Sequence, residues 1–312
     1  MTERERFAAT LRREKVPGRV PTFELQFFLT MEAVGLVHPH HTSFRQWKQM
    51  TDSERSAHLD YRARTFAAFA EKYDHSAVNI TDLRVLERFR EVCSRELYVT
   101  MEIDPTFSMP NGDDMFVFAE RLYEDETGLK AEAEKRLADA IRRVEEETLA
   151  HPGQIDGILM TADYCFNTNP FFSPAQFEVY VAPYLARFIQ ACKDCGYQTI
   201  KHTDGNIYPI LDQLADCQPD ALHSIDPQAK VSLAEVSAKY GDRLALCGNV
   251  NCGLLQTGTD AEAAADIRRS LRDGMARGYG YVFCTSNCAY TGLPLDRYEM
   301  MIDIWRKEGI YA

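Results

Sequence analysis

The sequence predicts an α/β fold, a (β/α)8 TIM-type barrel with N-terminal helical and hairpin elaborations. Two observations predict it. From about residue 155 onward, five short apolar runs alternate with helical segments, and further strands in the N-terminal half bring the total near eight. Strands that alternate with helices form parallel sheets, and strands that are apolar on both faces are expected when helices cover them. A doubly wound open sheet is the main alternative.

The C-terminal half is the regular part. It begins with a buried strand over 156–163, and Ser173 followed by Pro174 is typical of a helix start, with a helix to about Cys195. The same alternation then continues to the end of the chain. Strands are expected at 197–202, 220–226, 243–247 and 280–285, and helices at 206–217, 231–239, 260–277 and 294–307.

The N-terminal half is less regular. Helices are expected at 3–13, 52–72 and 129–149, and strands at 19–27 and 76–80. Residues 95–122 are expected to form a β-hairpin that turns at Pro110-Asn-Gly-Asp113. Because no linker, low-complexity tract or repeat interrupts the chain, residues 1–312 are expected to form a single domain.

Composition restricts the partners. The chain has 312 residues, is 45% hydrophobic and carries a net charge of −12, which argues against a nucleic acid or an anionic membrane as partner. No apolar run could span a bilayer, and the charged N-terminus lacks a signal peptide's apolar segment, so we expect a cytoplasmic protein. The nine scattered cysteines fit free thiols there. A homodimer is the commonest default for its assembly.

Polar side chains follow almost every predicted strand at its C-terminal end, which is where barrel enzymes carry their chemistry. These residues are Glu24 and Gln26, Asn79 and Asp82, Asp163 and Tyr164, His202 and Asp204, His223 and Asp226, Asn249 and Asn251, and Cys284 and Asn287. No glycine-rich phosphate loop and no Gly-x-Ser-x-Gly elbow is present, which argues against dehydrogenases, kinases and serine hydrolases.

Three of these residues predict a metal site. His202 and Asp204 are two positions apart, so their side chains point the same way on an extended segment. Cys284 would join them from the other side of the barrel mouth, and three protein ligands with an open position are typical of catalytic zinc. Cys288 is an alternative thiol. In the other interpretation, His202 and Asp204 bond to each other or to a substrate, and Cys284 is a core residue.

The C-terminal two thirds resembles the uroporphyrinogen decarboxylase superfamily, and especially its corrinoid-linked, zinc-dependent methyltransferases. The resemblance rests on the N-terminal segment 4–28, on the short segments 181–184, 240–244, 257–259 and 309–311, and on four further stretches, and it implies a (β/α)8 barrel. The four stretches are Phe172-Ser-Pro-Ala-Gln-Phe177, Lys201-His-Thr-Asp-Gly-Asn206, Cys247-Gly-Asn-Val-Asn251 and Phe283-Cys-Thr-Ser-Asn287.

The methyltransferase branch binds zinc with His-x-Cys and a distant third Cys. His202 and Cys284 match the first and last positions, but Asp204 stands at the middle one. A carboxylate makes the site harder, which argues against thiol methylation but is compatible with zinc or another divalent metal. The strand 21–28 has no Arg like those that hold carboxylates in the true decarboxylase. Unless a cation intervened, a polycarboxylate would also be repelled by Glu24, Asp163, Asp204 and Asp226, which argues against porphyrinogen decarboxylation.

The leading hypothesis is a metal-assisted methyltransferase. It moves a methyl group between a small methylated compound and a corrinoid on a partner protein, since this chain has no cobalamin module. The metal is Zn2+ on His202, Asp204 and Cys284, with Glu24 as a possible further ligand. The catalytic residues are Asp163, Asp204 and His202, and the substrate-binding residues are Glu24, Tyr164, Asn249 and Asn287.

Two other hypotheses stay open. A decarboxylase or lyase without a metal would use Asp204 or Asp163 as a proton carrier. A barrel that is not an enzyme would bind a tetrapyrrole or a corrinoid protein.

Overall fold

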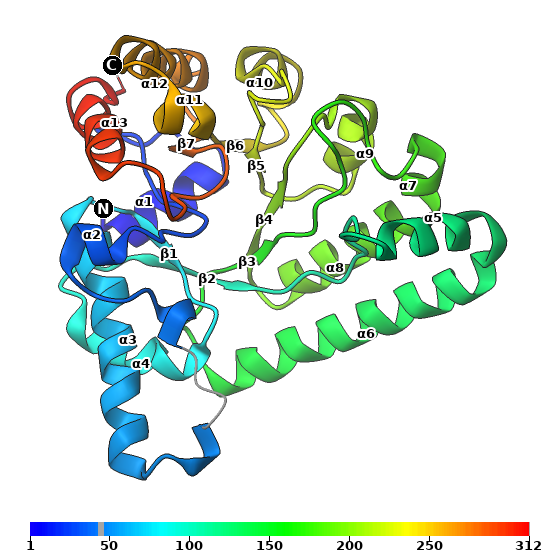
Figure 1. Cartoon of the computed structure of the whole chain (residues 1–312), viewed down its shortest axis with the longest axis horizontal. Helices are drawn as coiled ribbons and strands as arrows, with labels where there is room; N and C mark the ends of the chain where they lie inside the picture. The colour runs from blue at the N-terminus through cyan, green and yellow to red at the C-terminus, as the bar shows by residue number, and fades with distance from the viewer. Residues whose placement is uncertain (43–46, 312) are drawn as a thin grey trace.

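A single parallel sheet organises the chain. The computed structural model describes residues 1–42 and 47–311. Within them, seven strands lie side by side in chain order, and each pairs with its neighbours in parallel (Figure 1). The strands are β1 (Ala77–Asn79), β2 (Tyr98–Glu102), β3 (Gly157–Met160), β4 (Gln198–Thr203), β5 (Ala221–Ser224), β6 (Ala245–Val250) and β7 (Tyr281–Thr285). The predicted α/β class and parallel sheet are confirmed.

The expected first strand, 19–27, does not form. This segment makes isolated bridges instead, of which Thr22–Phe283 joins it to β7. The amide of Ser76, just before β1, donates to the Thr22 carbonyl at 2.7 Å. The segment therefore lies between the first and last strands, and the sheet curls so that its two edges approach each other. Pro21 has no N–H to donate, which helps explain why no regular ladder forms.

The hairpin expected at 95–122 is wrong. β2 pairs with β1 on one side and with β3 on the other, so it has no free edge for a hairpin partner. The Pro110-Asn-Gly-Asp113 turn leads into helix α5 (Asp114–Glu124), and α6 (Glu126–Ala150) follows. These four residues precede a helix instead of joining two strands of a hairpin.

Helices surround the sheet (Figure 1). Besides α5 and α6, they are α1 (Glu3–Leu11), α2 (Thr30–Val34), α3 (Asp52–Lys72), α4 (Leu86–Val92), α7 (Pro174–Tyr180), α8 (Ala182–Asp194), α9 (Leu211–Asp216), α10 (Leu233–Tyr240), α11 (Cys252–Thr257), α12 (Asp260–Met275) and α13 (Leu295–Glu308). Short 3-10 turns are η1 (Pro39–Thr42), η2 (Trp47–Gln49), η3 (Leu83–Val85) and η4 (Tyr208–Ile210). None of the helices in the described part of the chain is both long and apolar enough to cross a membrane.

The start of the helix expected at 173–195 is confirmed. The Ser173 side chain accepts from the Gln176 amide while the Gln176 side chain accepts from the Ser173 amide, and Pro174 occupies the first turn. The helix is not continuous, however, because the backbone leaves helical geometry at Val181 and separates α7 from α8.

Helix α1 closes one end of the curled sheet. Phe7 and Leu11 are fully buried in a cluster with inward-facing strand residues such as Ile200 and Val282. The side chain of Gln198, the first residue of β4, donates to the Ala8 carbonyl at 3.1 Å. Because α1 covers the N-terminal ends of the strands, their C-terminal ends are left to carry the polar residues.

Candidate metal centre

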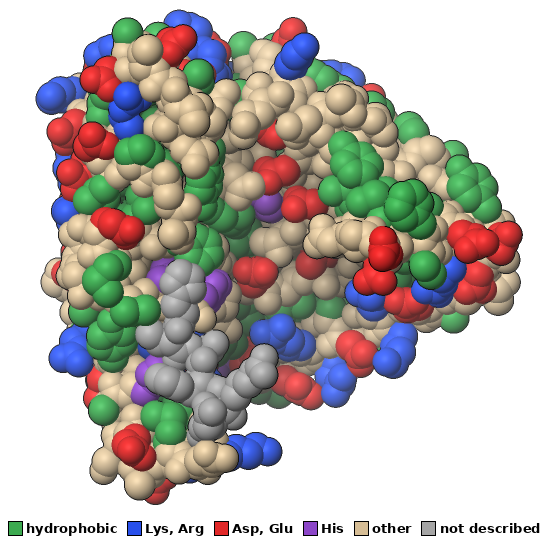
Figure 2. Space-filling view, in the orientation of Figure 1, with side chains coloured by type: hydrophobic (Ala, Val, Ile, Leu, Met, Phe, Trp, Pro, Cys, Tyr) green, Lys and Arg blue, Asp and Glu red, His purple; other side chains and the backbone are tan. Residues whose placement is uncertain are grey.

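Three side chains converge at the C-terminal ends of β3 and β4. The ligand atoms of Asp163, His202 and Asp204 all lie within 4.8 Å of one another. His202 is the penultimate residue of β4, Asp204 directly follows that strand, and Asp163 follows β3. Figure 2 shows acidic side chains around a histidine in a hollow of the molecular surface. Two adjacent parallel strands thus bring an imidazole and two carboxylates together.

The imidazole of His202 faces both carboxylates. Its Nε2 atom lies 3.7 Å from Oδ1 of Asp163 and 3.8 Å from Oδ2 of Asp204. These separations are too long for direct hydrogen bonds. Ligands held about 2.0–2.1 Å from a tetrahedral cation are roughly 3.3 Å apart, so a modest contraction would let all three atoms reach one ion. The arrangement fits a shared cation better than a hydrogen-bonded triad.

The other nitrogen of His202 is held by a second histidine. Nδ1 of His202 lies 2.7 Å from Nδ1 of His223, its ladder partner on β5. Both rings are buried. Burial lowers the pKa of His223 well below its ordinary value, and the neighbouring His202 lowers it further. His223 is therefore neutral at pH 7. A metal-binding histidine commonly has its second nitrogen fixed by a hydrogen bond, and His223 can accept one here.

Asp204 is fixed by hydrogen bonds from the end of β5 and from the loop after β7. Ser224, at the end of β5, donates to Oδ1 at 2.6 Å, and the Asn287 amide donates to Oδ2. Burial raises the pKa of Asp204; His202 opposes this shift, whereas the charge of Asp163 adds to it. A buried carboxylate beside another carboxylate is an electrostatic setting that a cation would stabilise.

The turn after β4 depends on a glycine. Gly205 has a φ of +83°, and a Cβ there would lie 2.5 Å from the Cys165 carbonyl oxygen. Only glycine therefore allows the β3 and β4 loops to approach this closely. The approach lets the Asp204 amide donate to Oδ1 of Asp163 at 3.0 Å, which joins the two carboxylates in one unit.

Sequence comparison identifies the family. The model of the uroporphyrinogen decarboxylase (URO-D) family matches residues 135–308, more than half of the chain. The chain belongs to this family. The matched region includes β3 to β7, and with them all three converging residues. The predicted resemblance is confirmed. No curated protein matches the chain significantly.

Solved structures agree with the family assignment at the level of the fold. A methyltransferase from Methanosarcina mazei is similar to this family member with a TM-score of 0.72 at 17% identity, over 99% of each chain. A triazine hydrolase variant matches with a TM-score of 0.43 at 12% identity, over 90% of this chain and 62% of its own. The first match supports the fold, and the second is too weak to support any argument.

Cys284, expected as the third ligand, lies outside the converging group. Its fully buried thiol packs in the interior cluster with Val282 and Cys247. Burial raises the pKa of Cys284 well above its usual value, and so does the nearby Glu24. The structure groups Asp163, rather than Cys284, with His202 and Asp204.

Glu24, a predicted substrate-binding residue and possible ligand, is also separate from the group. Its carboxyl is buried and accepts hydrogen bonds from the Thr285 hydroxyl and, at 3.4 Å, from the Thr285 amide. Burial raises the pKa of Glu24 to about 8. Among the residues described, its partners belong to β7 and α13 rather than to the converging group.

The other three predicted substrate-binding residues occupy different places. Tyr164 is fully buried, with its hydroxyl 2.7 Å from the Thr106 hydroxyl. Asn249 is also fully buried and donates to the Ile225 carbonyl at 2.7 Å. Asn287, by contrast, is partly exposed and bonds to Asp204. Of the three, Asn287 alone lies beside the converging group.

Two partners of the site were not assigned roles from the sequence. His223 was expected at a strand end, and Ser224 was not singled out at all. The register of β4 against β5 could have placed both residues at the site, because His202 pairs with His223 and Thr203 pairs with Ser224. Once β4 and β5 are taken as adjacent parallel strands, a second histidine in the same layer follows.

Proposed function

We propose that this protein is a metal-assisted methyltransferase that moves a methyl group between a small methylated compound and a corrinoid on a partner protein. The observation that supports it is the convergence of His202, Asp163 and Asp204 at the C-terminal ends of β3 and β4. These residues would hold a divalent cation, with zinc as the first candidate because one nitrogen and two oxygens suit it. The fold similarity to a methyltransferase supports the same class of reaction.

A bound cation would supply Lewis acidity at the heteroatom that carries the methyl group. The protein's own residues prepare the site. His223 orients the His202 imidazole, while Ser224 and Asn287 fix the Asp204 carboxylate. The Asp163 side chain is 39% exposed, so the group can be reached from solvent on this side. A small substrate would enter there and place its heteroatom beside the three ligands.

Methyl transfer can be tested with free reduced cobalamin in place of the partner's corrinoid. Purified protein loaded with zinc would be mixed with cob(I)alamin and a panel of small methylated amines, ethers and thioethers. We expect the absorbance of cob(I)alamin to convert to that of methylcobalamin with at least one compound. Asp163→Asn should slow the conversion, and Lys239→Ala on the exposed face of α10 serves as the control. Absence of conversion with every class of donor, by protein that holds its metal, would contradict the proposal.

A second candidate is a decarboxylase or lyase that needs no metal. The observation that favours it is the buried position of Asp204 beside Asp163, which raises the pKa of the Asp204 carboxyl and so favours its protonated form, the form that could deliver a proton to a carbanion. The two candidates differ in their response to chelators. A lyase of this kind would keep full activity in EDTA and lose it in Asp204→Asn, whereas the methyltransferase would lose activity in both cases.

A further inference from the structure

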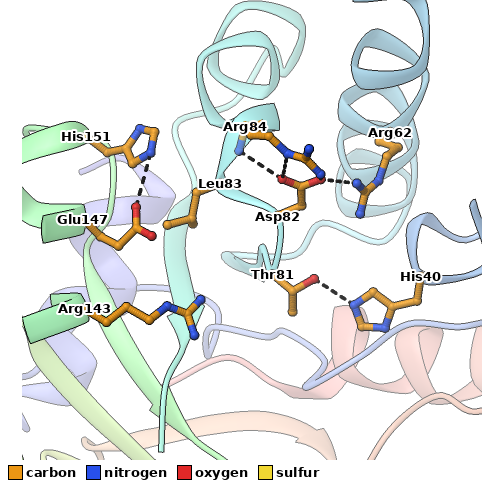
Figure 3. Close-up of a pocket in the computed structure, with 9 residues that line it drawn as sticks. All are labelled: His40, Arg62, Thr81, Asp82, Leu83, Arg84, Arg143, Glu147 and His151. Atoms are coloured by element: carbon orange, nitrogen blue, oxygen red, sulfur yellow. Dashed lines mark hydrogen bonds and ion pairs between the residues drawn. The ribbon is translucent and has the colours of Figure 1, made fainter. Parts of the chain in front are cut away.

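A cavity lies away from the three converging residues. It has a volume of about 540 Å³, within the range of small-molecule sites. Its walls come from α3, from η1, from η3 and the residues before it, and from the C-terminal end of α6 (Figure 3). The lining residues are His40, Arg62, Thr81, Asp82, Leu83, Arg84, Arg143, Glu147 and His151. None of them belongs to the candidate metal centre.

The charge of this cavity is opposite to that of the whole protein. Three guanidinium groups line it against two carboxylates, while the chain as a whole carries a net charge of −12. Both carboxylates already have cationic or imidazole partners. Asp82 is bound by Arg62 and Arg84 together, and Glu147 lies 3.5 Å from the His151 imidazole. One aspartate between two arginines leaves a positive charge on that wall.

Guanidinium donors remain available on this wall. Arg62 is 5% exposed and bonds to Asp82 through Nη1, while its buried Nε has no partner among the described residues. Arg84 uses Nε and Nη2 on Asp82, at 2.7 Å each. Asp82 therefore acts as a fixed anchor that holds two cations side by side, a costly arrangement in a partly buried place unless further negative charge is bound.

The opposite wall adds a third cation. Arg143 extends from α6 toward the cavity, and in Figure 3 no dashed line joins its guanidinium to another group. It makes no hydrogen bond or ion pair with residues 1–42 or 47–311, whereas its neighbour Arg142 pairs with Asp139 at 2.8 Å. Thr81 adds a hydroxyl, 2.9 Å from Nε2 of His40. Cationic side chains therefore face the space from both sides.

We propose that this cavity binds a small organic anion that carries a carboxylate or phosphate group. Arginine forks match both groups with paired hydrogen bonds. The two charged walls favour a ligand with negative charge at more than one point, and Leu83 supplies a small apolar contact. The site is independent of the proposed methyl transfer, since it shares no residue with the metal centre.

Calorimetric titration of the intact, EDTA-treated protein tests the proposal. Inorganic phosphate and tricarballylate serve as the two probes, at low ionic strength. We expect at least one to bind, and the preferred probe identifies the oxyanion. Arg143→Gln should weaken binding by roughly tenfold, because it removes charged hydrogen bonds. It should leave folding intact, because Arg143 has no partner in the described part of the chain.

Arg142→Gln is the matched control on the same helix. It removes an equal charge one residue away, from a side chain that pairs with Asp139. Its binding constant should equal that of the wild type. The proposal is overturned if neither probe binds at millimolar concentration, if Arg143→Gln binds as tightly as the wild type, or if both variants weaken binding equally.

Discussion

The Nδ1 atoms of His202 and His223 lie 2.7 Å apart in the interior of the curled sheet. Only one proton can lie between them. If Nε2 of His202 gives its lone pair to a cation, Nδ1 of His202 carries the proton and His223 accepts it. His223 must then carry its own proton on Nε2. This buried atom has no hydrogen-bond partner among the described residues, and the Phe23 ring lies 5.7 Å from the His223 ring.

Replacing His223 should therefore weaken metal binding without unfolding the protein. His223→Phe keeps the ring volume but removes the acceptor for His202. We expect zinc affinity, measured by competition with a chromophoric chelator, to fall by about 10–100-fold. His75→Phe is the matched control, because His75 is also buried but bonds to Tyr298 instead. Equal affinities for wild type and His223→Phe would show that this contact does not support the metal.

Glu24 should make stability depend on pH. Its pKa rises from 4.5 to about 8 on burial, so the folded state holds a proton that the unfolded chain has released between these values. The contribution of Glu24 to stability should therefore be greatest below about pH 4.5 and should fall through this window by about 1.4 kcal/mol per pH unit. Glu24→Gln removes the titration. We expect the difference in unfolding free energy, Glu24→Gln minus wild type, to increase from pH 5 to pH 8.

Urea unfolding at several pH values measures this difference. Because all other groups titrate alike in both proteins, the difference isolates Glu24. A difference that stays constant across the window would mean that Glu24 is already ionised in the fold.

A buried ion pair between Lys201 and Asp104 supports the loop that follows β3. Lys201 is fully buried, and its ammonium donates to Asp104 at 2.8 Å and to the Ala162 carbonyl at 2.9 Å. Lys201→Met leaves the Asp104 charge without its partner, which should cost about 3–5 kcal/mol in urea unfolding. Adding Asp104→Asn should recover part of this loss. A loss below about 1 kcal/mol for the single variant would show that water replaces the ammonium.

The regular βα units were predictable because the sequence features that mark them, such as apolar runs and helix-capping residues, lie within a few residues of each element. The strand expected at 197–202 corresponds to β4 at Gln198–Thr203, and the start signal at Ser173 is used as predicted. The errors arise where local signals permit two outcomes. Pro110-Asn-Gly-Asp113 suits a hairpin turn or the entry to a helix, and the partners of β2 are decided by strands distant in sequence.

The candidate site was predictable in part for the same reason. His202 and Asp204 share one strand end, so their spacing places them together. Asp163 was expected to be catalytic, but its place beside them depends on the glycine turn at Gly205 and on the pairing of β3 with β4. Cys284 was expected at the metal from its position at a strand end. Whether a thiol from β7 reaches β4 depends on the curvature of the sheet, which spacing in one sequence does not encode.

Metal content is the most direct test of the central claim that Asp163, His202 and Asp204 hold one divalent cation. Wild type, His202→Ala and Cys284→Ala would be stripped with chelator, reloaded with zinc, desalted and analysed by mass spectrometry. We expect about one zinc per chain in wild type and in Cys284→Ala, and almost none in His202→Ala. Zinc that survives in His202→Ala, or that is lost in a folded Cys284→Ala, would contradict this ligand set.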